Sequence, residues 1–372
     1  MTEPFEFADG IGQGSVKGRA AGLNPANRFE DLRLHVLGEH LDEIAAENPD
    51  GTRVVTQVYR DTSKTILCTN DSPDIPFTWS VNPYRGCEHG CIYCYARPYH
   101  EYLSLSCGLD FETKIVAKYD APELLREALL KPGWLGEPIV MSGVTDPYQP
   151  IESKLRITRR CAEVCAELAQ PLSFITKNAL ITRDIDCLQE LAVHKAAHAA
   201  ISITTLDNRL AAQMEPRASS PRERLAAVKR LADAGIPVQV MVAPIIPALN
   251  ESEAPAILRA AADAGAYAAG YTLVRLPHQV KSLFLDWLKR VHPMRAAHVE
   301  AAIRDTREGE LTATGFGVRM RGEGERAAQI SRMIKLFKRR YGLDQPWRKL
   351  ASEEFQRRKH AGVSRGQMGL FG

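Results

Sequence analysis

Six short apolar runs, separated by longer amphipathic segments, limit the fold of this chain more than any other feature of its sequence. Runs of this length between polar or Gly-containing segments are typical of buried strands, and the segments between them are typical of helices. Strands that alternate with helices predict repeated βα units around a parallel sheet. The expected strands are residues 77–81, 138–143, 172–176, 199–204, 238–244 and 268–274.

Five segments between these runs have the periodicity of helices. Ser220, Pro221 and Glu223 predict the start of one of them, with Ser as N-cap, Pro in the first turn and Glu at the capping-box position. Right-handed crossovers would curl six such strands into an α/β fold, a partial (βα)6 TIM-like barrel whose active site faces the carboxyl ends of the strands. The expected helices are residues 121–131, 158–169, 184–195, 221–234 and 252–264.

Composition divides the 372 residues into three parts. Residues 1–70 lack sustained periodicity and are expected to form a partly flexible N-terminal extension, residues 71–300 to form the catalytic core, and residues 301–372 to form a basic C-terminal region with a terminal tail. The net charge is only +3, but residues 326–372 hold twelve Lys or Arg against three Asp or Glu. We therefore expect a basic, helical C-terminal appendage on a mildly acidic body.

Three of the eight cysteines form a C-x3-C-x2-C motif just after the first expected strand, at Cys87, Cys91 and Cys94. By chance this spacing arises in about 0.004 of chains with this cysteine content. Cysteine thiolates are the usual ligands of iron–sulfur clusters, and a [4Fe–4S] cube has four irons. Three ligands in one loop leave one iron free for another molecule, so the motif predicts a cluster that does more than carry electrons.

A structural zinc site is the alternative for these cysteines. Zinc prefers four protein ligands, which His89, His100, Cys68 or Cys107 could complete. The remaining cysteines are expected to be small buried hydrophobic residues. They are Cys68, Cys107, Cys161, Cys165 and Cys187.

The location expected from the sequence is the cytoplasm. No run of about 18 apolar residues exists, so no membrane contact is expected, and the acidic N-terminus lacks the pattern of a signal peptide. Three cysteines within eight residues are also unlike the disulfide framework of a secreted protein.

The segment NPYRGCEHGCIYCYARPYH, followed by βα repeats, resembles the radical S-adenosylmethionine superfamily over residues 77–300. The resemblance implies two cofactors, a [4Fe–4S] cluster and S-adenosyl-L-methionine, whose reductive cleavage gives a 5′-deoxyadenosyl radical that abstracts hydrogen from a substrate. It also implies a flavodoxin- or ferredoxin-type reductant. Tyr93 matches a position that is commonly aromatic and lies near the adenine in that superfamily.

With TDPYQPIE and TKN downstream, the chain looks most like the bacterial family related to spore photoproduct lyase, the so-called DNA repair photolyases. That resemblance implies a lyase or related reaction in DNA repair. One departure matters, because spore photoproduct lyase returns hydrogen through a cysteine on the second-strand loop, where this chain has Val144. Tyr95 and Tyr99 are alternative hydrogen donors, on proximity to the cysteines.

Polar residues at the expected strand ends are candidates for binding the cofactor. Hydroxyls and carboxylates accept hydrogen bonds from an ammonium group, and an arginine can hold a carboxylate through two hydrogen bonds. The lysine at the end of the third expected strand resembles a lysine near the cofactor in the spore photoproduct lyase branch. Capping and a solvated strand end are the structural alternatives. The candidates are Ser142, Thr145, Asp146, Lys177, Ser202, Glu215 and Arg217.

The basic C-terminal region is expected to contact nucleic acid. Residues 326–341 place five apolar side chains on one helical face, which should pack on the barrel and leave a positive stripe in water. A merely solvated stripe, with a protein or a small metabolite as substrate, is the second hypothesis, and a non-enzymatic metal-binding protein is the third. The five apolar residues are Ile330, Met333, Ile334, Phe337 and Tyr341.

The last residues suggest a further partner. Residues 367–371, QMGLF, resemble the short peptide with which bacterial polymerases and repair proteins bind the DNA sliding clamp. Met368, Leu370 and Phe371 would fill apolar pockets and Gln367 would bond at the rim. The alternative is a tail that docks on its own core or has no fixed structure.

Overall fold

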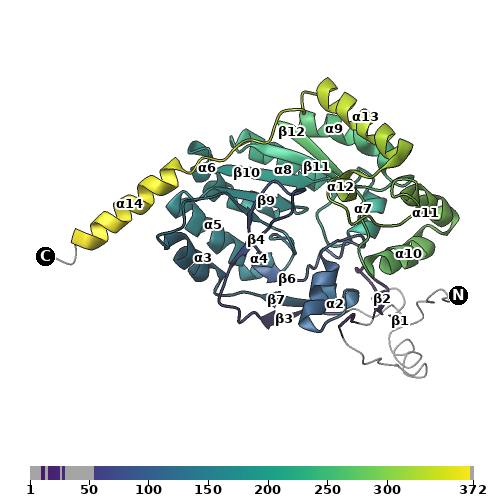
Figure 1. Cartoon of the computed structure of the whole chain (residues 1–372), viewed down its shortest axis with the longest axis horizontal. Coiled ribbons are helices and arrows are strands. Elements are labelled where there is room, and N and C mark those ends of the chain that lie inside the picture. Colours follow the sequence, from purple (N-terminus) through teal and green to yellow (C-terminus); the bar gives the residue numbers. More distant parts are fainter. Residues whose placement is uncertain (1–9, 13–15, 26, 30–53, 369–372) are drawn as a thin grey trace.

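The computed structural model of the chain describes residues 10–12, 16–25, 27–29 and 54–368, and side chains between residues 16 and 361 (Figure 1). The proposed clamp-binding peptide, residues 367–371, lies outside the described side chains. Within the described part of the chain, no helix has the length and apolar character that a bilayer span requires.

A seven-stranded sheet forms the centre of the molecule, in the order β12-β11-β10-β9-β8-β5-β4. Six strands are parallel and follow one another in chain order, and the edge strand β4 pairs antiparallel with β5. All six expected strands are therefore confirmed, and the α/β, partial-barrel fold class is correct. The strands are β4 (Leu67–Thr69), β5 (Trp79–Val81), β8 (Ile139–Met141), β9 (Leu172–Thr176), β10 (Ala197–Ser202), β11 (Val238–Ile245) and β12 (Ala268–Leu273).

Helices between the parallel strands cover the outside of this sheet (Figure 1). The capping box expected at the start of α8 is present: the Ser220 hydroxyl accepts from the backbone N–H of Glu223, whose carboxylate accepts from Ser220. The helices match the five expected ones to within a few residues. They are α3 (Ala121–Leu130), α5 (Ile157–Leu168), α6 (Ile185–Val193), α8 (Pro221–Asp233) and α9 (Ala254–Asp263).

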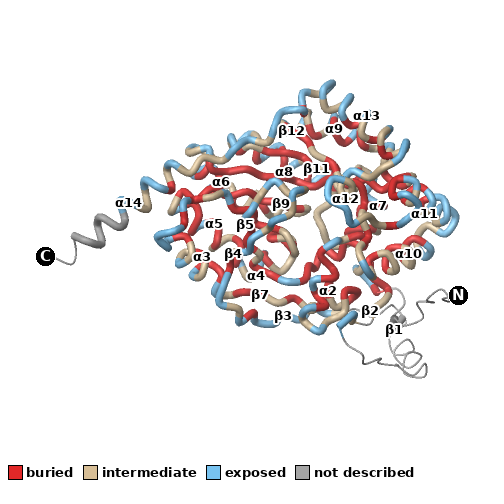
Figure 2. The backbone as a smooth tube through the Cα atoms, in the orientation of Figure 1, coloured by how far each residue is buried: buried red, intermediate tan, exposed pale blue. Residues whose placement is uncertain are grey.

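Buried apolar side chains from the strands and these helices form one main core, and Figure 2 shows the buried residues of these elements in red. Short polar segments at the carboxyl ends of the strands include the helices α4 (Glu152–Leu155), α7 (Asn208–Met214), η2 (Ala179–Asp184) and η3 (Glu251–Glu253). The core thus fixes the strands, and the site residues follow the strand ends.

A second, three-stranded sheet lies beside the barrel and was not expected. Its order is β3-β7-β6, with β3 (Gln57–Arg60) parallel to β7 (Lys114–Ala117) and β6 (Tyr84–Arg85) antiparallel to β7. A short pair, β1 (Gly10–Gly12) with β2 (Leu23–Pro25), packs near α2 (Leu109–Thr113). Residues 1–70, expected to be an extension, thus contribute strands to all three sheets.

The C-terminal region packs against the barrel as a series of helices. On α13, Ile330 and Ile334 are buried, and Met333, Phe337 and Tyr341 pack partly buried against the main core, so the expected apolar face is confirmed. The helices are α10 (Val280–Val291), η4 (Pro293–Arg295), α11 (Ala296–Arg304), α12 (Val318–Arg321), α13 (Gly324–Arg340) and α14 (Glu353–Met368).

Residues 342–352 cross the amino ends of the parallel strands. Asp344 bridges to Ala268 at the start of β12, and the ring of Trp347 lies 4.1 Å from that of His198 on β10. Phe355 then anchors the first turn of α14 in the core, and the helix projects away from the body (Figure 1).

Candidate active site at the cysteine loop

The three cysteines of the motif lie in an irregular loop between β6 and the 3-10 helix η1 (Arg97–Leu103). The loop turns three times, through backbone hydrogen bonds from Gly90 to Cys87, from Cys94 to Cys91 and from Arg97 to Cys94. Cys87 and Cys91 are buried and Cys94 is half-buried, and none forms a disulfide. Six parallel strands present their carboxyl ends to the same region.

Arg97 fixes the conformation of this loop from inside the protein. Its guanidinium is fully buried, forms an ion pair of 2.5 Å with Glu112, and donates to the carbonyls of Cys91, Gly90, Cys107 and Gly108. The charged guanidinium can be buried here because each of its N–H donors has a hydrogen-bond acceptor. The pair thus ties the cysteine loop to α2.

Glu88, between the first two cysteines, ties the loop to the barrel. Its buried carboxylate accepts hydrogen bonds from Thr56, from the backbone of Ile151 and from Arg217 at 2.9 Å. Arg217 is thus engaged by Glu88, and its expected role toward a cofactor carboxylate remains a prediction.

The donor set of the loop fits a cluster with three protein ligands. Burial raises the pKa of Cys87, Cys91 and Cys94, and the pKa of Cys87 is raised further by Asp146 and by the other two thiols. Protonated thiols are the stable form of an empty loop, whereas coordination to iron stabilises the thiolates. Cys87, Cys91 and Cys94 would therefore hold the cluster.

The loop does not have the geometry of a single-ion site. Within the part of the chain that the structure describes, no three His, Cys, Asp or Glu side chains converge closely enough to hold one metal ion. A cube of four irons separates its cysteine ligands more widely than a tetrahedral zinc ion does. Among the described side chains, no preformed tetrahedral zinc site surrounds the cysteines.

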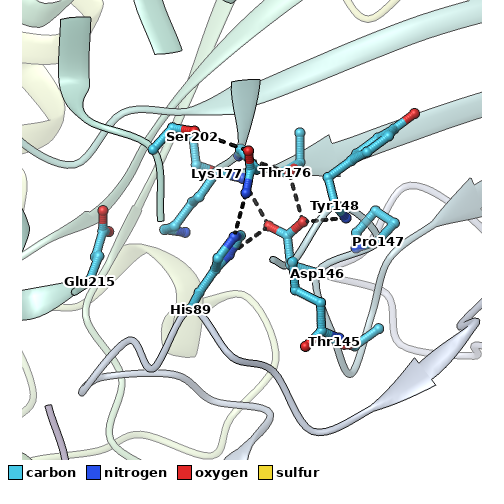
Figure 3. Close-up of polar contacts among 12 residues, drawn as sticks. His89, Thr145, Asp146, Pro147, Tyr148, Thr176, Lys177, Ser202 and Glu215 are labelled. Atoms are coloured by element: carbon cyan, nitrogen blue, oxygen red, sulfur yellow. Dashed lines mark hydrogen bonds and ion pairs between the residues drawn. The ribbon is translucent and has the colours of Figure 1, made fainter. Parts of the chain in front are cut away.

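Asp146, after β8, is the centre of a buried polar network (Figure 3). Its carboxylate lies 3.3 Å from Nδ1 of His89 and accepts from the Thr176 hydroxyl at 2.7 Å and from the backbone N–H of Lys177 at 2.9 Å. Burial raises the pKa of Asp146, but His89 and these hydrogen bonds outweigh it and bring the pKa to about 2. Asp146 therefore joins the cysteine loop to the end of β9 as a carboxylate.

Glu215, after α7, lies apart from the Asp146 network (Figure 3) and is the centre of a second network. Its carboxylate accepts from the hydroxyls of Tyr93 and Thr204 and from the buried guanidinium of Arg224. Burial raises the pKa of Glu215, but Arg224, Lys177 and the two hydroxyls bring it to about 2. Arg224 also donates to the carbonyl of Ser202, so this network holds the end of β10.

Lys177 places a positive charge between the two networks. Its ammonium lies 5.8 Å from the centroid of the Tyr93 ring, and it lowers the pKa of Cys91 and Cys94, although burial dominates there. An ammonium above an aromatic ring is attracted by the ring quadrupole. The expected role of Lys177 toward the cofactor remains a prediction.

The hydroxyls of Ser142 and Thr145 form hydrogen bonds with backbone carbonyls and are therefore not free. The Thr145 hydroxyl donates to the carbonyl of Gly86 at 2.7 Å, and the Ser142 hydroxyl donates to the carbonyl of Thr145 at 3.3 Å. They link the end of β8 to the first residue of the cysteine loop.

Tyr95 and Tyr99 lie on the surface beside the third cysteine. Tyr95 is 46% exposed and its hydroxyl donates to the carbonyl of Gly143, next to Val144, at 2.8 Å. Tyr99 is 52% exposed, one turn further along η1. Their role as hydrogen donors stays a prediction.

The expectation that the other cysteines are buried is wrong for Cys68, which is exposed because β4 is an edge strand.

Sequence reasoning missed three buried charged residues around the loop and gave His89 only as a possible zinc ligand. Each has its partner far away in the chain or in an unexpected element, so no spacing reveals it. The only signal was local: Glu88, His89 and Arg97 stand within the cysteine motif segment. The missed residues are Glu88, Arg97 and Arg224.

Comparison with known proteins agrees with this geometry. An uncharacterized protein of Mycobacterium tuberculosis is 36% identical over 221 residues, which are 59% of this chain and 65% of that protein. The chain thus spans slightly less than two thirds of this curated relative. A protein of Pseudomonas phage M6 named radical SAM Nα-GlyT isomerase is 26% identical over 170 residues, 45% of this chain and 33% of that protein.

Among solved structures, a spore photoproduct lyase variant with bound AdoMet and dinucleoside spore photoproduct superimposes with a TM-score of 0.52. The superposition covers 82% of this chain and 92% of the lyase chain. The two sequences are 15% identical, so the likeness shows a shared fold. Residues 81–261 match the model of the Radical SAM superfamily, a segment that runs from the end of β5 into α9 and contains the whole cysteine loop. With the expected sheet and the cysteine loop both present, residues 81–261 form a domain of the radical SAM superfamily.

Proposed function

We propose that this protein is an enzyme that cleaves S-adenosylmethionine reductively and abstracts hydrogen from a nucleic-acid substrate. The observation that carries the proposal is the clamped loop of three unpaired cysteines at the carboxyl ends of six parallel strands. When bound, the [4Fe–4S] cluster and S-adenosylmethionine supply the electron and the 5′-deoxyadenosyl radical.

The chain's own residues would bind and orient the cofactor. Lys177 offers a cation for its carboxylate, Asp146 and Glu215 keep negative charge within reach of its amino group, and the Tyr93 ring offers an apolar face for the adenosyl part. The buried networks around Asp146 and Glu215 hold these groups before the cofactor arrives, which avoids reorganisation during the reaction.

A lyase or a DNA-repair reaction is the finer part of the proposal. It is supported by the fold shared with spore photoproduct lyase and by the basic C-terminal region. Val144 packs against the small apolar cluster of Cys87, Ala96 and Phe111 and occupies the position of the donor cysteine of spore photoproduct lyase, so hydrogen return would need another group. Tyr95, bonded to the neighbouring Gly143, is our candidate.

The test is anaerobic reconstitution followed by incubation with S-adenosylmethionine and either dithionite or a reduced flavodoxin. We expect about four irons per chain, 5′-deoxyadenosine in the wild type, and neither in a variant with Ala at Cys87, Cys91 and Cys94. Full 5′-deoxyadenosine formation by the triple variant, or zinc without iron in the wild type, would refute the proposal. Added polynucleotide should change the yield of 5′-deoxyadenosine, whereas a protein or a small metabolite would do so if it were the substrate.

A further inference from the structure

A group of arginines lies at the carboxyl end of β12, beside the cysteine loop. Arg275 follows this strand, and its guanidinium lies 5.2 Å above the ring of Tyr95, the residue after Cys94. Tyr95 in turn donates to the carbonyl of Gly143 after β8. This chain of contacts joins the end of β12 to the end of β8 across the mouth of the barrel.

The sheet is open between its two edges, and side chains close this gap. No hydrogen bonds between strands join β12 to β4. Instead Arg319, on α12 next to β12, forms an ion pair of 2.5 Å with Asp74, which follows β4. The arginines therefore stand where a substrate would approach the cysteine loop from the side.

These arginines carry more positive charge than their surroundings neutralise. Burial lowers the pKa of Arg275, and Arg319 lowers it further; burial and then Arg275 do the same to Arg307. Among the described residues, Asp74 is the one carboxylate within ion-pair distance of any of the three. Arg307 is 2% exposed, and its buried Nε has no hydrogen-bond acceptor.

Exposed aromatic rings continue from this group along η1. Residues three apart lie on one face of a 3-10 helix, and the rings of Tyr99 and Tyr102 have their centroids 6.3 Å apart. Tyr95, Tyr99 and Tyr102 are 46%, 52% and 67% exposed. These three exposed rings follow the third cysteine within eight residues and form an aromatic surface beside a buried site, in which Tyr102 also packs on Phe29 with ring centroids 5.1 Å apart.

We infer that this surface, defined as Arg275, Arg319, Tyr95, Tyr99 and Tyr102 and called the mouth platform, binds a single-stranded polynucleotide substrate. Bases stack on exposed aromatic rings and phosphates pair with arginines, and both contacts recur along an unpaired strand. A duplex hides its base faces, and an acidic peptide offers charge without rings to stack. The inference rests on the proposed function and names the substrate class for its site.

The test measures binding apart from chemistry. Cluster-loaded protein, without reductant, is titrated with a fluorescent single-stranded oligonucleotide of about twelve nucleotides, and its anisotropy is compared with that of the matching duplex and of a fluorescent poly-glutamate peptide. DNA and RNA versions are both used. We expect the single strands to bind at least about tenfold more tightly than the duplex or the peptide, because each stacked base adds affinity.

Single substitutions separate stacking from charge. Tyr102→Ala should weaken binding about tenfold with little change in salt dependence, since stacking contributes by the ring face. Arg275→Gln should reduce the slope of log affinity against log salt by about 0.7, the value for one phosphate contact to a single strand. Matched controls are Tyr59→Ala, on a 46% exposed tyrosine of β3, and Arg230→Gln, on an exposed residue of α8.

The outcomes distinguish the platform from the proposed function. Equal affinities in the platform and control variants, or tighter binding of the duplex or the peptide, would overturn the platform. Iron content and thermal midpoint are measured for every variant, so that a misfolded protein is recognised and replaced by Tyr102→Leu, for which the same loss of stacking is expected. A wild type that binds single strands but never forms 5′-deoxyadenosine would refute the proposed function and leave the platform standing.

Discussion

Arg97 shows how one buried side chain determines the shape of the cysteine loop. Arg97→Gln should lower the free energy of unfolding of the cluster-free protein by about 3–5 kcal/mol, because Glu112 is left as a buried charge without its partner. The loop also loses the donor that binds four carbonyls, so reconstituted protein should hold less iron. Urea unfolding and iron analysis measure the two effects.

The matched control is Arg126→Gln, which breaks an ion pair with Glu167 on the surface. Arg126 and Glu167 are 39% and 59% exposed, so the loss should stay below about 1 kcal/mol. Similar losses in the two variants would show that Arg97 is not a special support of the loop.

Glu215 gives a prediction about pH. Its folded pKa of about 2 is lower than that of an unfolded glutamate, so its carboxylate contributes stability that is complete above the unfolded pKa and is lost as pH falls toward 2. Glu215→Gln should therefore cost a constant amount between about pH 7 and pH 5.5, and less at about pH 3.5. Urea unfolding of both cluster-free proteins checks this, and a cost that does not change with pH would contradict it.

At the scale of residues, the sequence predicted the site residues that lie close together in the chain. It missed the residues that only the fold brings together. Cys87, Cys91 and Cys94 could be found because a metal-binding loop needs its ligands at short spacing. The Arg97–Glu112 pair could not, because a buried arginine and a surface arginine look alike in a sequence, and only α2 packing beside the loop distinguishes them.

At the scale of elements, the cysteine loop depends on a glycine that cannot carry a side chain. Gly90 has φ +66°, and a Cβ there would lie 2.7 Å from Oε2 of Glu112, which Arg97 holds in place. Gly90→Ala should destabilise the cluster-free protein by at least about 1 kcal/mol more than the backbone strain alone, because a close contact is added to it. Iron per chain should fall as well.

Gly309→Ala is the control for that strain. Gly309 has φ +90°, but no atom lies within 4 Å of the Cβ position, so its substitution carries the conformational cost without the close contact. Losses of the same size in both variants, with unchanged iron, would show that the loop tolerates a side chain at Gly90.

Strands and helices were predictable to the extent that their burial follows a simple pattern. β10 is buried at all six residues and α8 has a complete capping box, so both could be read from apolar runs and cap residues. β3 is mostly exposed and pairs with β7, more than fifty residues later, so its own residues carry no period to detect. The strands in the described parts of residues 1–70 could therefore not be predicted from those residues alone.

At the scale of the whole molecule, positive charge is spread over two surfaces with different surroundings. The mouth platform follows the carboxyl ends of the strands, whereas α13 lies on the outside of the barrel against α9 and β12 (Figure 1). The apolar face of α13 is buried, so its charges point into water, and Arg332 is 63% exposed beside Glu325. Any attraction of a polynucleotide by α13, as proposed above, would therefore act away from the cysteine loop.

The mouth platform and the charged face of α13 should contribute to polynucleotide binding over different distances. Measuring binding at two salt concentrations separates the two contributions. Arg332→Glu, Lys335→Glu and Arg339→Glu together should weaken binding of a single-stranded oligonucleotide at low salt, because the replaced charges act through water over roughly 10 Å or more. At about 0.5 M salt this difference should nearly vanish, whereas Tyr102→Ala should still bind more weakly than the wild type, because stacking is not screened. Anisotropy titrations at both salt concentrations make the comparison. If the triple variant binds like the wild type at low salt, the stripe on α13 is only a solvated helical face, and substrate contact belongs to the mouth alone.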